Sequence, residues 1–582
     1  MKKVLLLLTP LLSLMTTLSA KTSPADRRFD TWKEAFVLRM WEVYPAWASA
    51  VGYHKYDSVL VIPDAASRKR ELEFCRANLD SLKKFRLAAL SPANKTDHRL
   101  IENQLQSAIW GIEELRAYEW DPSGYNVSGG FAEMLANDHA PLDERLRNFS
   151  KRLKYVPAYY EAAKQNIKNP TKEHMDLAIT QNKGGLSVFA EDLVEPLKKS
   201  ALSEWEKEQI RLGCEAATKA MNDYVRWLMT LKNETPRSFR LGKALYDKKF
   251  GYELQSGYTP EVMYRKAMAH KQELHNKMYV ITRDLWPRYM AGKTMPADTL
   301  VAIRQMIDKL SEEHVAPEEF QAAIEKQLPI LVDFIKRKDL LYIDPSKPLV
   351  VRREPAYMAG VAGASINSPG PYDKEGNTYY NVGSLDGWDK AKAESYLREY
   401  NKYILQILNI HEAIPGHYTQ LVYANRSPSI IKAILGNNAM IEGWAVYTEL
   451  MMLENGYNGD DTTATTAAPE MWLMYYKWNL RSTCNTILDL GVHTMNMSQE
   501  EAIHLLMDEA FQQDAEAYGK WRRVQVTQVQ LCCYFTGFTE ICDLRAELKR
   551  KKGTAFGLKK FHESFLGYGS APVKYIRELM LR

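Results

Sequence analysis

The chain has 582 residues, of which 46% are hydrophobic and 26% charged, and its basic and acidic side chains leave a formal charge of 77 − 72 = +5. This composition is typical of a soluble globular protein, large enough to be stable without disulfides or a structural metal. The charge excess is too small to indicate nucleic-acid binding, so we expect no nucleic-acid partner.

The chain begins with a segment typical of a secretory signal peptide. Two lysines precede an apolar stretch from Val4 to about Leu18, and small residues follow at Ser19 and Ala20. We expect cleavage after Ala20, so that residues 1–20 are removed and the mature protein is exported, either periplasmic or secreted. A permanent membrane anchor is the alternative, but the stretch is short and contains a proline. No cysteine lies near the cleavage site to carry a lipid, and we expect no membrane contact after cleavage.

Helical patterns occupy most of the mature chain. Residues 28–52 carry apolar side chains at three- and four-residue spacing and end at Gly52. Similar segments recur at residues 66–90, 97–118, 141–168, 203–232, 259–284 and 298–313. Residues 345–390 differ, because they are rich in Gly, Pro, Asn and strand-forming residues, and "NTYYNV" (377–382) is the best strand candidate. The sequence therefore predicts a mainly α fold with a small β patch.

The same pattern gives the domain organisation. We predict an N-terminal helical region over residues 21–344 and a catalytic helical region over residues 345–582, within one continuous body. No Gly/Ser-rich or Pro-rich linker separates them. The six cysteines show no CxxC spacing, so they predict no structural zinc site, and their pairing stays open.

The stretch "HEAIPGHYTQ" (411–420) carries the strongest chemical signal. In a regular helix, residues six apart differ by about 240° in direction and about 9 Å in rise, so His411 and His417 could not share a metal ion. Pro415 lacks an amide donor and Gly416 tolerates unusual backbone angles. We therefore expect the helix to bulge or break here and bring His417 beside His411.

A third metal ligand is available downstream, in "MIEGWAVYTELMMLENG". Glu442 and Glu449 are seven residues apart, which is two turns on one helix face. Two histidines and Glu442 would form a zinc site with one open position, and we predict one Zn²⁺ per chain. Glu412 is the candidate general base, and Glu449 either supports a ligand histidine or is a structural glutamate. The alternative is a kinked core helix with buried histidines.

The order of motifs resembles a known family. "HEAIPGHYTQ" is similar to the active-site helix of the thermostable carboxypeptidases with two residues inserted. The resemblance is greater to the bacterial domain-of-unknown-function family 885, placed among the gluzincin-type metallopeptidases. Its HExxPGH, EGWAxYxE, DxGxH and QxxxYxxG patterns occur here at residues 411–417, 442–449, 489–493 and 530–537. Weaker family-like features extend over nearly the whole mature chain.

The resemblance implies a large helical gluzincin-like fold with a channel that favours short peptides. It also implies that a tyrosine far downstream donates to the oxyanion, and Tyr534 matches that position, with core packing as its alternative role. His493 is a candidate proton donor or else a core histidine. The strand at 377–382 is expected to offer either an edge for an extended peptide or an ordinary buried edge.

These features together predict a secreted zinc metallopeptidase that hydrolyses peptides with metal-activated water. Two alternatives stay open: a metal-dependent esterase or amidase acting on non-peptide substrates, and a catalytically silent binding protein on the same scaffold. The sequence leaves open the substrate sequence, endo- or exopeptidase action, the metal used in the cell and the oligomeric state.

Overall fold

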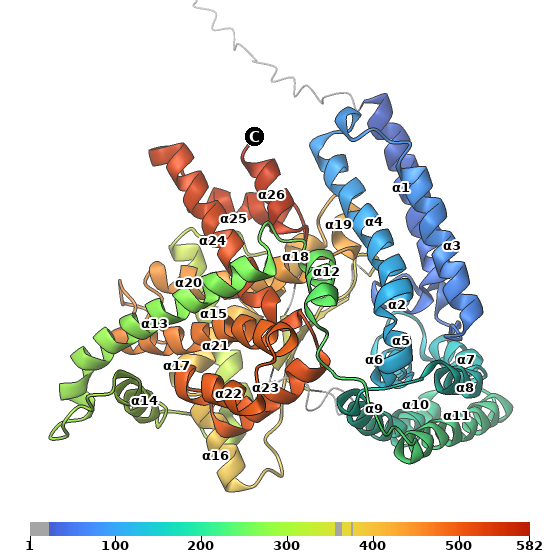
Figure 1. The fold of residues 1–582 in the computed structure, drawn as a ribbon, viewed down its shortest axis with the longest axis horizontal. Coiled ribbons are helices and arrows are strands. Elements are labelled where there is room, and N and C mark those ends of the chain that lie inside the picture. Colours follow the sequence, from blue (N-terminus) through green and yellow to red (C-terminus); the bar gives the residue numbers. More distant parts are fainter. Residues whose placement is uncertain (1–22, 348, 355–363, 374–375) are drawn as a thin grey trace, which may run out of the picture.

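The computed structural model describes residues 23–347, 349–354, 364–373 and 376–582. The expected signal segment, residues 1–20, lies outside the described residues. Figure 1 shows two helical lobes, with the N-terminal helices in one and the chain from α12 onward in the other. Within the described parts of the chain, no helix is both long and apolar enough to span a bilayer.

The N-terminal lobe consists of helices joined by short turns. In chain order they are α1 (Pro24–Val43), α2 (Pro45–Ala50), α3 (Ala65–Leu82), α4 (Pro92–Trp110), α5 (Ala117–Trp120), α6 (Ser128–Ala136), α7 (Leu142–Leu153), α8 (Val156–Asn166), α9 (Lys172–Gly184), α10 (Glu191–Lys199) and α11 (Glu204–Thr230).

Two predicted helices of this lobe are each divided in two. The pattern over residues 28–52 breaks after Val43, because Pro45 has no amide donor to continue α1 and instead occupies the first turn of α2. The pattern over residues 141–168 likewise divides between α7 and α8, with Pro157 in the first turn of α8.

The second lobe holds the remaining helices. They are α12 (Lys243–Leu254), α13 (Pro260–Tyr289), α14 (Thr299–Leu310), α15 (Phe320–Arg337), α16 (Lys390–Glu399), α17 (Lys402–Glu412), α18 (His417–Ala424), α19 (Ile430–Ile434), α20 (Asn438–Glu454), α21 (Pro469–Thr494), α22 (Gln499–His504), α23 (Asp514–Val526), α24 (Cys533–Lys552), α25 (Leu558–Gly567) and α26 (Val573–Met580).

A small sheet precedes α16 and contacts the helix that carries the first histidine. Its strand order is β1 (Leu349–Arg353), β3 (Thr378–Val382) and β2 (Ala364–Asn367), parallel for the first pair and antiparallel for the second. Tyr380 of β3 is fully buried and donates to Asn409 Oδ1 on α17 at 2.8 Å. The mainly α fold with a small β patch is thus confirmed.

The prediction that residues 377–382 form an edge strand is wrong. β3 is the central strand, paired on one side with β1 and on the other with β2. Its backbone groups are therefore already used within the sheet and cannot pair with an extended peptide.

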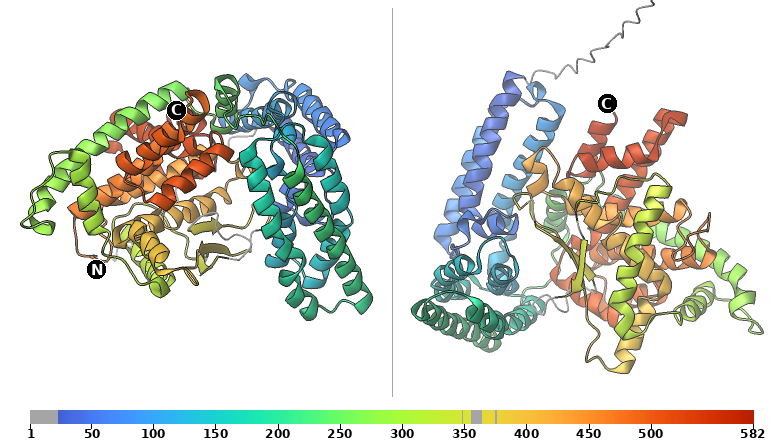
Figure 2. Two further views of the ribbon diagram at one scale, coloured as in Figure 1. Left: turned by 60° about the horizontal axis from the view of Figure 1, so that its bottom comes forward. Right: turned by 180° about the vertical axis from the view of Figure 1, so that it is seen from behind.

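Three apolar cores organise the molecule. One joins residues between Leu241 and Ile576, so α12 to α15 pack with the C-terminal half. A second lies within residues 125–228. A third combines α1 to α4 with α19 of the second lobe, which lies beside α4 in Figures 1 and 2.

A buried ion cluster ties the two lobes together at this third core. Asp97 of α4 is 1% exposed, and it binds Lys33 of α1 at 2.8 Å. The same carboxylate accepts from Ser429 Oγ at 2.8 Å and pairs with Lys432 of α19. Both lysines are buried and Asp97 compensates the charge of each, while Asp30, also on α1, pairs with Lys33 at 2.9 Å.

Candidate metal centre

The chain breaks helical geometry between the two histidines. α17 ends at Glu412 and α18 begins at His417, and the Ile414–Pro415 peptide bond between them is cis. Gly416 donates its amide to Ile410 O at 2.9 Å. A Cβ at Gly416 would collide with the carbonyl oxygen of His411, so only glycine fits there.

The break brings the two imidazoles together, as the Pro-Gly pair predicted. The ring centroids of His411 and His417 lie 4.8 Å apart with perpendicular planes. His411 lies in the last turn of α17, which is buried over residues 403–411, and such all-round burial is typical of a core helix. The histidine pair is therefore held by two helices, with His411 in the last turn of α17 and His417 as the first residue of α18.

Glu442 of α20 faces both histidines. Its Oε2 atom lies 3.3 Å from His417 Nε2 and 3.7 Å from His411 Nε2. Asn437 caps α20 by accepting from Met440 N at 2.9 Å, which fixes the first turn of the helix next to this glutamate. Three ligand-type atoms thus converge, as expected from the sequence.

Glu449 lies two turns further along α20 and contacts the Nδ1 atom of His411, on the opposite side of the ring from the Nε2 atom that faces Glu442. It is fully buried, and its Oε1 atom lies 2.7 Å from His411 Nδ1 and accepts from Trp478 Nε1 at 3.0 Å. A proton on Nδ1 leaves the Nε2 lone pair of His411 free on the side of Glu442. Trp478 of α21 belongs to none of the four motifs, so the sequence analysis did not identify it.

Glu412 is the other carboxylate of the cluster. Ligand atoms of Glu412, His411 and His417 all lie within 4.8 Å of one another. Burial raises the pKa of Glu412, and the nearby imidazoles only partly oppose this. A carboxylate with a raised pKa beside two metal-ligand-type imidazoles has the properties of a general base.

The electrostatics of the cluster favour a bound cation. Burial lowers the pKa of His411, yet Glu442 and Glu449 raise it to about 10, so a cation that binds Nε2 would have to displace a proton from this ring. The imidazoles of His417 and His411 in turn hold the pKa of Glu442 well below its ordinary value, in spite of burial. The buried Oε2 atom of Glu442 has no hydrogen-bond donor. A divalent cation between these atoms fits the donor set and would supply the missing partner.

Tyr534 lies in the first turn of α24, near Glu442. Its hydroxyl oxygen accepts from Arg523 Nη2 at 3.1 Å and from Gln530 Nε2 at 3.5 Å. Burial, and next the charge of Glu442, raise the pKa of Tyr534, so the hydroxyl keeps its proton. Because Arg523 and Gln530 both donate to the hydroxyl oxygen, the hydroxyl hydrogen of Tyr534 is not used in these two bonds and can be donated to another acceptor. Arg523 was missed from the sequence because it lies outside the four motifs.

Two glycines explain how Tyr534 and Glu442 come close. α20 and α24 cross at Gly443 and Gly537, where a Cβ on Gly443 would collide with the backbone of Gly537. A Cβ on Gly537 would collide with the carbonyl oxygen of Ala439. The space beside Gly537 is therefore filled by α20, and the contact sets the distance between the two helices.

The structure favours the core alternative for His493. This residue is 2% exposed, and its Nε2 donates to Val524 O at 2.8 Å while its Nδ1 accepts from Leu241 N at 3.4 Å. Both ring nitrogens are used by the backbone, so neither is free to transfer a proton to a substrate.

Asp489, at the other end of the same motif, supports the Tyr534 segment. Its carboxylate accepts from Val529 N at 3.0 Å and from Leu531 N at 3.1 Å. These bonds fix the turn that contains Gln530. The "DLGVH" motif therefore positions the segment before Tyr534 and does not contact the histidine cluster through Asp489.

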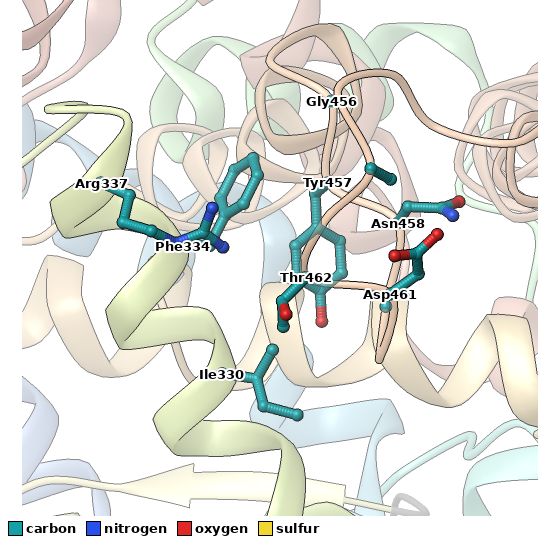
Figure 3. Close-up of a pocket in the computed structure, with 10 residues that line it drawn as sticks. Ile330, Phe334, Arg337, Gly456, Tyr457, Asn458, Asp461 and Thr462 are labelled. Atoms are coloured by element: carbon teal, nitrogen blue, oxygen red, sulfur yellow. The ribbon is translucent and has the colours of Figure 1, made fainter.

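A separate surface depression lies between α15 and the turn after α20 (Figure 3). Phe334 and Tyr457 form part of its wall, and Tyr457 donates to Gln406 Oε1 at 2.5 Å. None of its lining residues belongs to the histidine cluster. The converging metal-ligand side chains lie in the histidine cluster and not in this depression, so the cluster is the candidate site.

Comparison with known protein families gives the same family that the four sequence motifs resemble. Residues 45–580 match the family described as "Bacterial protein of unknown function (DUF885)". A solved structure from Shewanella oneidensis, described as a predicted lipoprotein of unknown function, is 51% identical with a TM-score of 0.85, and the match covers 95% of this chain and 100% of that one.

A second solved structure, described as a predicted lipoprotein from Colwellia psychrerythraea, is 16% identical with a TM-score of 0.76, covering 95% of this chain and 98% of that one. At this identity the likeness concerns the fold alone. No curated protein matches the chain. From the family match over residues 45–580, the chain belongs to the bacterial DUF885 family, whose description assigns no function.

Proposed function

We propose that the protein is a zinc-dependent metallopeptidase of the gluzincin type. One observation carries the proposal: the Nε2 atoms of His411 and His417 face the same Oε2 atom of Glu442, which is buried and has no hydrogen-bond donor. Two imidazoles and one carboxylate with an open fourth position are the ligand set of catalytic zinc sites.

The chain's own residues have defined roles in this proposal. A zinc ion held by His411, His417 and Glu442 would activate water and polarise the scissile carbonyl. Glu412 takes the proton of the attacking water and delivers it to the leaving amine. Tyr534 donates its free hydroxyl hydrogen to the oxygen that becomes negative in the transition state. Glu449 keeps the ring of His411 in the ligating tautomer.

We further propose that the protein works outside the cytoplasm on short peptides. The basic-apolar-small pattern of residues 1–20 supports export, as does the description of both structural relatives as predicted lipoproteins. N-terminal sequencing of protein from its host should find a mature chain beginning near Lys21 in a non-cytoplasmic fraction. An intact Met1 in the cytoplasm would contradict export.

The activity is tested by digesting a peptide library with the purified mature protein and identifying the products by mass spectrometry. We expect cleavage that a chelator abolishes and added zinc restores, and that Glu412→Gln loses while keeping its zinc. Glu325→Gln, an exposed change on α15, is the matched control. Cleavage of esters or amides but no peptides would favour the non-peptide hydrolase. A metal-free protein without hydrolysis would favour the binding protein.

Metal binding itself is tested by elemental analysis of His417→Ala against the wild type. We expect the variant to lose the zinc of this site, while His504→Ala, at an exposed histidine of α22, keeps it. Equal zinc affinity in His417→Ala and the wild type would refute the broken-helix argument.

A further inference from the structure

A second cluster of metal-ligand side chains lies in the N-terminal lobe, outside the four family-like motifs discussed above. His54 and Asp57 belong to the turn after α2, and His139 lies in the connection between α6 and α7. His54 Nδ1 and His139 Nε2 each lie 3.0 Å from the same Asp57 Oδ2 atom. Ligand atoms of the three residues all lie within 4.8 Å of one another.

The cluster is built into the protein rather than spread over its surface. The side chains of Asp57 and His139 are 2% and 7% exposed, and that of His54 is 28% exposed. Ser49 donates its hydroxyl to Asp57 Oδ1 at 2.5 Å and so orients the carboxylate. The rings of His54 and His139 are stacked, with centroids 3.5 Å apart and planes 6° apart.

The arrangement repeats the geometry of the candidate metal centre. In both places two imidazole nitrogens face one carboxylate oxygen, at 3.0 Å here and at 3.3 and 3.7 Å around Glu442. A metal ion on His139 Nε2 would leave the buried Nδ1 atom without a partner, as it is now, so the case for a metal rests on the three converging ligand atoms. Since two imidazoles and a carboxylate suit zinc and its first-row neighbours, and calcium or magnesium prefers oxygen ligands, the donor set selects a transition metal.

The competing interpretation is a metal-free hydrogen-bond network. Both imidazoles could donate an N–H to Asp57, and the buried guanidinium of Arg152 also interacts electrostatically with this carboxylate. The two interpretations differ in one measurable property, which is affinity for a divalent transition metal.

We propose that His54, Asp57 and His139 bind a second divalent transition-metal ion, with zinc as the preferred ion. The ion would join two parts of the N-terminal lobe that have separate cores. Tyr53 and Tyr56, which flank His54, pack on the core of α1 to α4 and α19, whereas α6 and α7 on either side of His139 pack into the core of residues 125–228. The role inferred from this placement is a cross-link between the two cores, with a solvent molecule completing the coordination at the partly exposed His54.

The experiment uses the full mature chain carrying His411→Ala and His417→Ala, so that the first candidate site is absent. Cobalt titration followed by visible absorption, and zinc competition against a chromogenic chelator, should then show one bound ion per chain. Zinc should also raise the melting temperature of this chain. Adding Asp57→Asn should weaken binding about tenfold or more and abolish the thermal shift, whereas adding His504→Ala should change neither.

The outcomes separate this proposal from the proposed function. The wild type is expected to bind two ions, and loss of one in each set of variants supports both sites. If the chain without His411 and His417 binds no ion, the second site is refuted while the first stands. If it binds an ion with the same affinity after Asp57→Asn, the ion lies elsewhere and the proposal fails. Should Asp57→Asn not fold, as judged by circular dichroism, His54→Ala at the partly exposed ligand replaces it, with the same expected loss of affinity.

Discussion

Replacing Glu449 with glutamine is the sharpest test of how the candidate metal centre is held. Glu449 is fully buried and touches His411 Nδ1 at 2.7 Å and Trp478 Nε1 at 3.0 Å through the same oxygen. Glutamine keeps the shape and that acceptor but removes the negative charge. The change therefore isolates the effect of the carboxylate on His411.

The contacts of Glu449 determine how much the change should weaken zinc binding and how much it should destabilise the fold. Loss of a carboxylate behind a ligand histidine lowers metal affinity about 10- to 100-fold, which is about 1.4 to 2.7 kcal/mol. The Oε2 atom of Glu449 is buried without a donor, so the amide group that replaces it would be a buried donor without an acceptor. Such an unsatisfied group costs about 1 to 3 kcal/mol of stability.

The assay is zinc competition against a chelator of known affinity, run beside thermal melts of the metal-free and zinc-bound forms. Glu449→Gln should bind zinc about 10- to 100-fold more weakly and melt at a lower temperature than the wild type. Glu454→Gln is the matched control, because Glu454 is exposed on the same helix and pairs with Arg545 at the surface. Wild-type zinc affinity in a folded Glu449→Gln protein would refute the role given to the carboxylate.

Three further predictions concern the oxyanion donor, the lobe contact and a titrating core carboxyl. Tyr534→Phe should lower kcat about 100-fold with KM and zinc content little changed, and an unchanged kcat would leave Tyr534 as a packing residue. Asp97→Asn should destabilise the protein by about 3 kcal/mol or more, measured as a lower denaturant midpoint, because Lys33 and Lys432 lose their buried carboxylate. Burial raises the pKa of Glu540 from 4.5 to about 7, so its contribution to stability is full below pH 4.5 and is lost as the pH rises through 7. Glu540→Gln should therefore gain up to about 3 kcal/mol relative to the wild type between these pH values, and a pH-independent difference would contradict this.

The sequence alone determined the helical character and the local chemistry of the protein. Periodic apolar positions marked most helices, and the composition of residues 345–390 marked the small sheet, because both depend on neighbours along the chain. The Pro415–Gly416 pair determined that the helix breaks after Glu412, since one residue lacks an amide donor and the other has no Cβ to meet the His411 carbonyl.

Only the tertiary structure decided which of these residues meet, because contacts between distant segments leave no periodic trace in one sequence. It supplied Trp478 behind Glu449 and Arg523 beside Tyr534, and it placed β3 in the centre of its sheet instead of at an edge. It also placed His139 beside His54 and Asp57, although His139 lies 82 positions after Asp57 in the chain (139 − 57 = 82). The physical reason is the same in each case: packing of separate helices, such as the glycine crossing of α20 and α24, sets these distances, and local propensity does not.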